Sequence, residues 1–169
     1  MLQHYTDERN IQIVISLLKA HGIKRVVASP GTTNLSFVAS IQQDSFFEIY
    51  SAVDERSAAY IACGMAAESG EAVVLSCTGA TASRNYMPAL TEAYYRNLPV
   101  LAITSAQHSG RIGALIPQVI DRFSQPNDLV KLSVHLPTIT TQEDEWNTIV
   151  KANTAILELF HHGTGPVHI

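Results

Sequence analysis

Apolar residues fall into two kinds of segment along this chain, and the two kinds alternate. In one kind, as at Ile11, Val14, Ile15 and Leu18, apolar positions recur every three or four residues, which predicts an amphipathic helix. In the other kind, apolar and β-branched residues run together without interruption, which is typical of strands that are covered on both faces. The expected strands are residues 26–29, 46–53, 72–77, 100–104, 129–136 and 165–169.

Capping and turn residues between these runs predict helices that connect the strands. Thr6 or Asp7 is expected to cap the first helix, which ends at His21, and Thr33 or Asn34 is expected to cap the second. Strands that alternate with helices at this spacing predict a three-layer α/β fold, with one doubly wound sheet of about six mostly parallel strands and helices on both faces. No repeat or linker interrupts the pattern, so residues 1–169 are expected to form a single domain. The later helices are expected over residues 35–43, 55–69, 83–96, 116–123 and 143–162.

The stretch from Ser51 to Gly79 organises the rest of the chain. Asp54 is a good helix N-cap, and Glu55 follows in the first turn, where free N–H groups and the helix dipole favour a carboxylate. The helix that follows is rich in alanine, so its backbone can pack close to another helix, and we expect this alanine face to contribute to a two-fold contact between subunits. The alternative is that the alanines pack only against the sheet of their own chain. These small residues are Ala58, Ala59, Ala62, Gly64, Ala66 and Ala67.

Composition narrows the class of protein. Charged residues make up only 15% of the chain and hydrophobic ones 46%, which suggests that part of the surface is buried against a partner. The net charge is -4 without a basic run, which argues against nucleic acid and anionic membranes as partners. The chain starts without a signal-peptide pattern, so a cytoplasmic protein is expected. Cys63 and Cys77 are isolated in apolar surroundings and are expected to be buried free thiols.

Three loops of small polar residues follow directly on predicted strands, at residues 30–34, 53–55 and 78–83. The carboxyl ends of parallel strands meet at one edge of a sheet, where such folds bind ligands. None of these loops is a dinucleotide or nucleoside-triphosphate motif, and no metal-binding spacing occurs. What remains is one carboxylate, Glu55, among backbone-rich loops, which suits a site that hydrogen-bonds a flat heterocycle and transfers a proton to it. The alternative is that Glu55 is a surface residue that only pairs with the helix dipole.

The run SPGTTNL, followed by VDERSAAYIACGMAAESGEAVVLSCTGATASRNYMPALTEAYYRNLPVLAIT, resembles the N-terminal pyrimidine-binding domain of thiamine-diphosphate-dependent enzymes. This family includes acetolactate synthase, the 2-oxo-acid decarboxylases and the menaquinone-pathway SEPHCHC synthase. The segments DERSAAY, NYMPALTEAYY and IGALIPQVID are most similar to the last of these. The resemblance extends from the first helix to GPVHI, and it implies the thiamine-diphosphate-binding fold and a decarboxylase or carboligase that acts on a small 2-oxo acid.

The resemblance also implies roles for single residues. The motif glutamate of the family falls on Glu55, which implies that Glu55 hydrogen-bonds the aminopyrimidine ring and promotes deprotonation of the thiazolium carbon, while the cofactor supplies the carbanion chemistry. Gln118 matches a glutamine that faces the substrate or the cofactor. The simpler alternative is that the matching glycines make turns, that Asn85 belongs to a helix cap and that Gln118 is solvated. The positions that match cofactor contacts are Pro30, Gly31, Thr78, Gly79, Ala80, Asn85 and Tyr86.

Two segments depart from the SEPHCHC synthase pattern. Thr32 and Thr33 stand where those enzymes have a serine-arginine pair, and residues 105–107 contain no arginine where those enzymes have one. Arginine binds carboxylates bidentately, so isochorismate is not implied as the substrate, and a different 2-oxo acid is the alternative. Arg84 and Arg111 are the candidates to take the place of the missing arginines on the substrate side.

A further departure concerns the diphosphate of the cofactor. The family binds magnesium and diphosphate in a separate domain through a Gly-Asp-Gly motif, which this chain lacks. We therefore expect no metal site in this chain, which is interpreted as the N-terminal part of a longer enzyme or as one subunit of a two-chain enzyme, inactive alone and assembled as a homodimer or higher oligomer. A third hypothesis is a non-catalytic α/β binding module.

Overall fold

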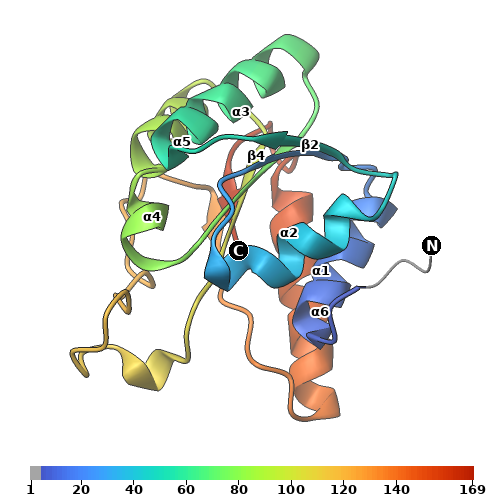
Figure 1. Cartoon of the computed structure of the whole chain (residues 1–169). Coiled ribbons are helices and arrows are strands. Elements are labelled where there is room, and N and C mark those ends of the chain that lie inside the picture. The colour runs from blue at the N-terminus through green and yellow to red at the C-terminus, as the bar shows by residue number, and fades with distance from the viewer. Residues whose placement is uncertain (1–4) are drawn as a thin grey trace.

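Six strands lie side by side in one sheet, and every neighbouring pair runs parallel (Figure 1). The computed structural model describes residues 5–169. The order across the sheet is β2-β1-β3-β4-β6-β5, so the chain first winds toward one edge and then toward the other. The strands are β1 (Arg25–Ala28), β2 (Glu48–Ser51), β3 (Val73–Cys77), β4 (Val100–Thr104), β5 (Leu132–Ser133) and β6 (Val167–His168).

Helices cover both faces of this sheet, which confirms the predicted three-layer α/β fold (Figure 1). One face is covered by α1 (Arg9–Ala20), α2 (Leu35–Gln42) and α6 (Gln142–Glu158). The other face is covered by α3 (Glu55–Ser69), α4 (Ala80–Arg84) and α5 (Met87–Tyr95). Two short 3-10 helices, Thr32–Asn34 and Ser109–Arg111, follow β1 and β4.

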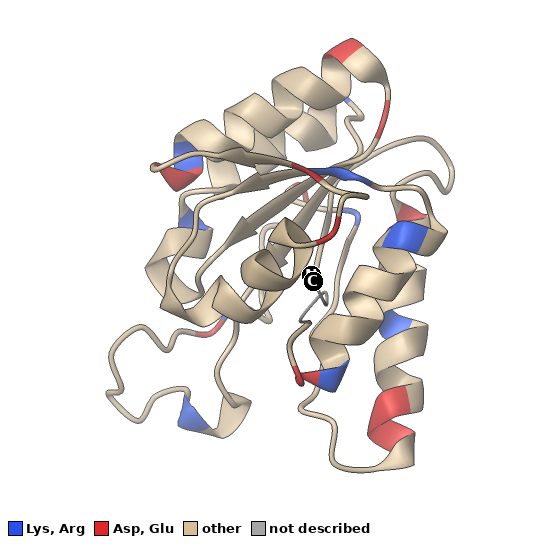
Figure 2. Ribbon diagram, turned by 45° about the vertical axis from the view of Figure 1, so that its right-hand side comes forward, with Lys and Arg blue, Asp and Glu red and all other residues tan. Residues whose placement is uncertain are grey.

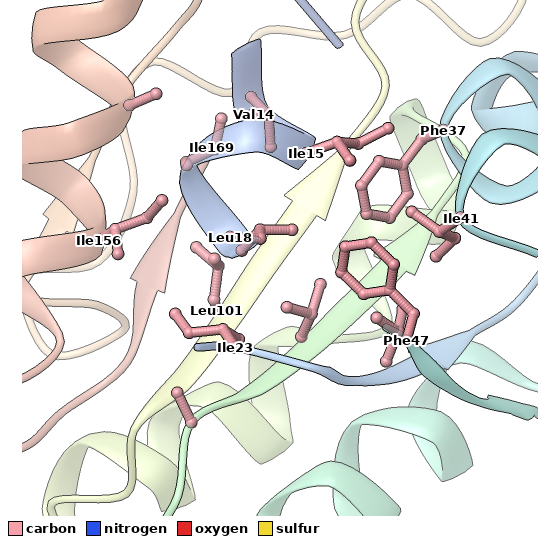
Figure 3. Close-up of a cluster of buried hydrophobic side chains, with 14 of the residues drawn as sticks. Val14, Ile15, Leu18, Ile23, Phe37, Ile41, Phe47, Leu101, Ile156 and Ile169 are labelled. Carbon is pink, nitrogen blue, oxygen red and sulfur yellow. The ribbon is translucent and has the colours of Figure 1, made fainter. Parts of the chain in front are cut away.

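Successive side chains of the central strands point to opposite faces of the sheet and pack into two separate cores. On β3, Val74 points to the α1, α2 and α6 side, whereas Val73 and Leu75 point to the α3 and α5 side. All five residues of β3 are buried, which is why the strand reads as a continuous apolar run. The first core consists mainly of large aliphatic and aromatic side chains, among them Ile15 and Phe37 (Figure 3).

Alanine is the most frequent residue of the second core. Ala58, Ala62 and Ala66 of α3 are fully buried against the sheet and α5 of the same chain. These alanines therefore pack within their own chain, which is the alternative that the sequence left open for them, whereas Gly64 and Ala67 of the same set are exposed. The expected two-fold contact between subunits stays a prediction. The outward face of α3 also carries Tyr60 and Ile61, which are 47% and 46% exposed.

The ends of α3 follow the sequence prediction closely. The Asp54 carboxylate accepts a hydrogen bond from the Ser57 backbone N–H at 2.7 Å, which satisfies one free donor of the first turn. Gly70 ends the helix with a φ of 69°, a left-handed conformation that glycine adopts without a steric penalty. Both termini of the helix that carries Glu55 are thus defined by local sequence.

Several predicted elements differ from the structure. The helix predicted over 83–96 is divided into α4 and α5, because Pro88 cannot continue a helix through the preceding turn. No helix forms over 116–123, where Pro117 and the positive φ of Leu115 and Gln118 prevent one. The strand predicted over 129–136 shortens to β5.

Predictions of helix caps were also only partly correct. The first helix is capped at Glu8, not at Thr6 or Asp7, and its cap makes no side-chain hydrogen bond. Asn34 does precede α2, but its side chain makes no capping bond there. The last helix ends at Glu158, four residues earlier than the predicted His162.

Charged residues are sparse and scattered over the ribbon, without a continuous basic band (Figure 2). Among residues 5–169, no helix has the length and apolar character needed to cross a lipid bilayer.

Candidate functional site

The loops at the carboxyl ends of β1, β3 and β4 are joined to one another by side chains. Asn34, which is buried, accepts a hydrogen bond from the Gly31 N–H at 2.8 Å and donates to the Ser76 hydroxyl at 3.2 Å. Ser105 donates from its hydroxyl to the Thr33 carbonyl oxygen at 2.7 Å. The three loops therefore form one connected edge, as their positions after parallel strands predict.

Glu55 lies at this edge, as the first residue of α3, and is half-buried. The Asn85 amide donates a hydrogen bond to its Oε2 atom at 3.3 Å, so the structure brings together two residues that the sequence placed in one site. The Oε1 atom has no hydrogen-bond partner within the part of the chain that the structure describes. One carboxylate oxygen is held in place, and the other is available to a ligand.

Tyr86 forms the buried floor beside Glu55. Its side chain is completely inaccessible, and its hydroxyl makes no hydrogen bond of regular geometry within residues 5–169. Burial raises the pKa of Tyr86 above its ordinary value, and the neighbouring Cys77 and the charge of Glu55 raise it further. Burial likewise raises the pKa of the Cys77 thiol to about 12, so this thiol stays protonated. Cys63 and Cys77 are free and buried, as predicted.

The two glycines of the site are required by contacts within the protein. A Cβ atom on Gly31 would lie 2.4 Å from Cγ2 of Thr78, and one on Gly79 would lie 2.4 Å from the Ser105 carbonyl oxygen. The second contact is with backbone, which cannot move aside as a side chain can. Both glycines thus allow neighbouring strand-end loops to approach closely, a packing role that differs from the turn formation considered from the sequence.

Two other predicted site residues have strained backbones. Ala80 has a φ of 54° where the chain turns from β3 into α4, and Gln118 has a φ of 61° in the loop after β4. Left-handed conformations cost a residue with a Cβ roughly 1 kcal/mol or more, and they persist where the surrounding structure enforces them. Both residues also line a cleft at this edge of the sheet.

This cleft, of about 700 Å³, lies on the α1, α2 and α6 side of the edge. Its volume is suited to a small-molecule ligand. Thr33, Gly79 and Ala80 also line it. The other predicted positions, namely Glu55, Pro30, Gly31, Thr32, Thr78, Asn85 and Tyr86, lie outside its lining.

The sequence analysis did not predict which arginine lines the cleft. Arg84 is exposed and donates to the Asp121 carbonyl oxygen at 2.9 Å, and Arg111 is exposed and donates to the Gln107 side chain at 2.8 Å. Neither lines the cleft. Arg122 does, half-buried in its wall, with its guanidinium directed at the end of β4. No local motif marks Arg122, because the residues that it contacts lie far from it in sequence.

Known proteins with similar sequences identify the family. Residues 10–128 match the model of the thiamine pyrophosphate enzyme, N-terminal TPP binding domain. The chain belongs to this family. Association with thiamine diphosphate follows from that membership at the level of the family.

Two curated relatives of this TPP-binding domain have the same name. The chain is 42% identical over 98% of its length to the 2-succinyl-5-enolpyruvyl-6-hydroxy-3-cyclohexene-1-carboxylate synthase of Bacteroides thetaiotaomicron, covering 30% of that protein. It is 35% identical over 98% of its length to the synthase of the same name from Porphyromonas gingivalis, covering 29% of it. The domain thus spans about 30% of the length of these relatives. This similarity agrees with the resemblance seen in the sequence.

A solved structure supports the same assignment. The thiamine diphosphate-dependent 4-hydroxybenzoylformate decarboxylase of Rhodococcus jostii RHA1 superposes with a TM-score of 0.73 at 28% identity, over 94% of this TPP-binding domain and 29% of the decarboxylase chain. The parallel sheet with helices on both faces is therefore the fold of this family.

Proposed function

We propose that this domain holds the aminopyrimidine part of thiamine diphosphate in an enzyme that decarboxylates a 2-oxo acid or couples it to an acceptor. The observation that carries the proposal is Glu55, a half-buried carboxylate with one oxygen fixed by Asn85 and the other available at the sheet edge. Relatives named as a synthase of the SEPHCHC type and as a benzoylformate-type decarboxylase support this class of chemistry.

The residues at the edge fit a flat, partly polar ring. Glu55 offers a hydrogen-bond acceptor at the start of α3, and the fully buried Tyr86 packs beneath this part of the edge. When bound, thiamine diphosphate would supply the carbon nucleophile that attacks the 2-oxo group. Glu55 would hold a proton in a hydrogen bond with a ring nitrogen, and Asn85 would keep the carboxylate in the orientation that this bond requires.

We further propose that the domain acts together with a diphosphate-binding domain, either in the same chain or in a second subunit. Magnesium is expected in that domain, because the resemblance implies that magnesium and diphosphate bind there through a Gly-Asp-Gly motif. We also propose a homodimer or higher oligomer, in which the exposed Tyr60 and Ile61 of α3 face a partner.

Replacement of Glu55 by glutamine tests the role of the carboxylate in the complete enzyme. Glutamine keeps the shape of the side chain but cannot take the proton, so hydrogen–deuterium exchange at the thiazolium carbon should slow by about two orders of magnitude or more. Glu68→Gln, at the exposed other end of α3, is the matched control and should exchange at the wild-type rate. Exchange at the wild-type rate in Glu55→Gln would leave Glu55 as a surface residue that only pairs with the helix dipole, and would favour the non-catalytic module.

A further inference from the structure

Arg122 is a half-buried cation without a carboxylate partner among the described residues. Its Nη1 atom donates to the Thr104 hydroxyl at 2.7 Å, and its Nη2 atom donates to the Ser105 carbonyl oxygen at 2.6 Å. Both acceptors are neutral, so the positive charge is oriented but not compensated. Arg25, the other half-buried arginine among residues 5–169, is paired with both Glu48 and Glu71.

Burial without an opposite charge is costly for a guanidinium, which remains charged throughout the accessible pH range. Burial indeed lowers the pKa of Arg122. An arginine keeps five N–H donors in a planar fork, and the two hydrogen bonds to β4 and its loop use only part of that capacity. The side chain is therefore positioned and still able to bind an anion.

The hydrogen bonds around Thr104 point to the same conclusion. The Gln125 amide nitrogen donates to the Arg122 carbonyl oxygen at 3.2 Å, which fixes the orientation of that amide. The same nitrogen lies 3.0 Å from Nδ1 of His168, so Nδ1 accepts and the imidazole proton belongs to Nε2. Burial and the nearby Arg122 charge lower the pKa of His168 to about 4, which keeps the ring neutral and this tautomer in place.

His168 then donates from Nε2 to the Thr104 hydroxyl oxygen at 2.7 Å. That oxygen accepts a second hydrogen bond from Arg122, so both of its lone pairs are in use. The hydroxyl proton of Thr104 has no acceptor among residues 5–169. An arginine and a hydroxyl thus present unused donors next to each other in the wall of the cleft.

The position of this pair relative to Glu55 is also informative. The Nη2 atom of Arg122 lies 3.6 Å from the point where a Cβ on Gly79 would be. The charges of Glu55 and Arg122 both reach the Cys77 thiol, the first raising its pKa and the second lowering it. The carboxylate and the guanidinium therefore both lie near the end of β3 and the turn that follows it.

We propose that Arg122 and Thr104 form a binding corner for a carboxylate of the substrate, a small organic acid that enters the cleft. This proposal rests on the proposed function. It gives Arg122 the role on the substrate side for which the sequence suggested Arg84 or Arg111. Arg122 would bind one carboxylate oxygen through its remaining N–H groups, and the Thr104 hydroxyl would donate to the same group. The apolar walls contributed by Ile11 and Phe37 would contact the carbon skeleton.

Succinate is a suitable probe, with the uncharged succinamide as its matched control at constant ionic strength. Titration of this chain with succinate, followed by amide NMR, should give saturable shifts centred on Gly79 and Ser105, and succinamide should give none. Arg122→Met should weaken succinate binding by about tenfold or more, because charge-assisted hydrogen bonds are lost. Arg25→Met removes an arginine from the opposite edge of the sheet and should leave succinate affinity unchanged.

Two further variants keep the test decisive if Arg122→Met melts at a much lower temperature. Thr104→Val preserves shape and removes the hydroxyl donor, and Arg122→Lys keeps the charge but loses the planar fork, so each should weaken binding by several-fold. The proposal is overturned if wild type shows no saturable shift near Gly79, or if these variants bind succinate as wild type does. The titration contains no thiamine diphosphate, so its failure is separate from a failure of the Glu55→Gln experiment.

Discussion

The two helical layers of this domain pack on the same sheet through side chains of different size. Alanines dominate where α3 and α5 meet the sheet, whereas isoleucine, leucine and phenylalanine fill the space under α1, α2 and α6 (Figure 3). Small side chains bring helix backbones close to the strands, which places Glu55 directly beside the end of β3. The opposite helices pack through large side chains, and the cleft opens on that side. The layer of α3 and α5, called the close layer below, thus positions a carboxylate. The layer of α1, α2 and α6, called the wide layer below, provides room for a ligand.

The close layer should tolerate no additional volume. Ala62→Arg would force a long charged side chain into a fully buried position, so we expect loss of cooperative folding or destabilisation by more than about 4 kcal/mol, measured by urea unfolding. Ala67→Arg, on the exposed side of the same helix, is the control and should change the free energy of unfolding by less than about 0.5 kcal/mol. Equal stability of the two variants would contradict the assignment of the inward face.

The stability of the domain should also respond to pH through His168, which hydrogen-bonds Thr104 at the end of β4. The pKa of its imidazole is about 4 in the folded chain, lowered by burial and by the charge of Arg122, against an ordinary value of 6.5. Between pH 4 and 6.5 the unfolded state binds a proton at His168 more readily than the folded state does. The contribution of the neutral imidazole to the free energy of unfolding is therefore fully present above pH 6.5 and is lost as the pH falls toward 4. The loss should reach about 3 kcal/mol.

Urea unfolding between pH 4 and 7 measures this effect, as the difference between wild type and His168→Gln. The difference should shrink in Arg122→Met, because the guanidinium is one of the two causes of the lowered pKa of His168. An equal pH dependence in wild type and His168→Gln would show that the imidazole is not buried as described.

The smallest expected effect concerns association through the outward face of α3. Ile61 and Leu157 are exposed to similar extents, 46% and 53%, on the close and the wide layer respectively. If α3 faces a partner subunit, Ile61→Arg should weaken self-association by about tenfold or more in sedimentation experiments, while Leu157→Arg should not. A wild-type monomer, or equal effects of both variants, would place the interface elsewhere.

Sequence patterns predicted the layers, the strands and both ends of α3, because each depends on local periodicity or on a capping residue. They also placed Glu55 and Asn85 in one site. They failed where a single proline or a left-handed residue decides the path, as at Pro88 and Gln118. Arg122 was out of reach for a different reason. It hydrogen-bonds Thr104, which lies 18 residues earlier in the chain, and no local sequence pattern predicts the path of the loop between them.

The place of β6 in the sheet has a consequence for the order in which the chain folds. Its residues come after those of all the other strands, yet Val167 pairs with Leu101 of β4 on one side and with Leu132 of β5 on the other. Parallel pairings between such distant residues are slow to form, because a long loop must close before any contact is gained. During synthesis, β4 therefore remains an unpaired edge until residues 167–168 leave the ribosome, and the nascent chain is most prone to aggregation in that interval.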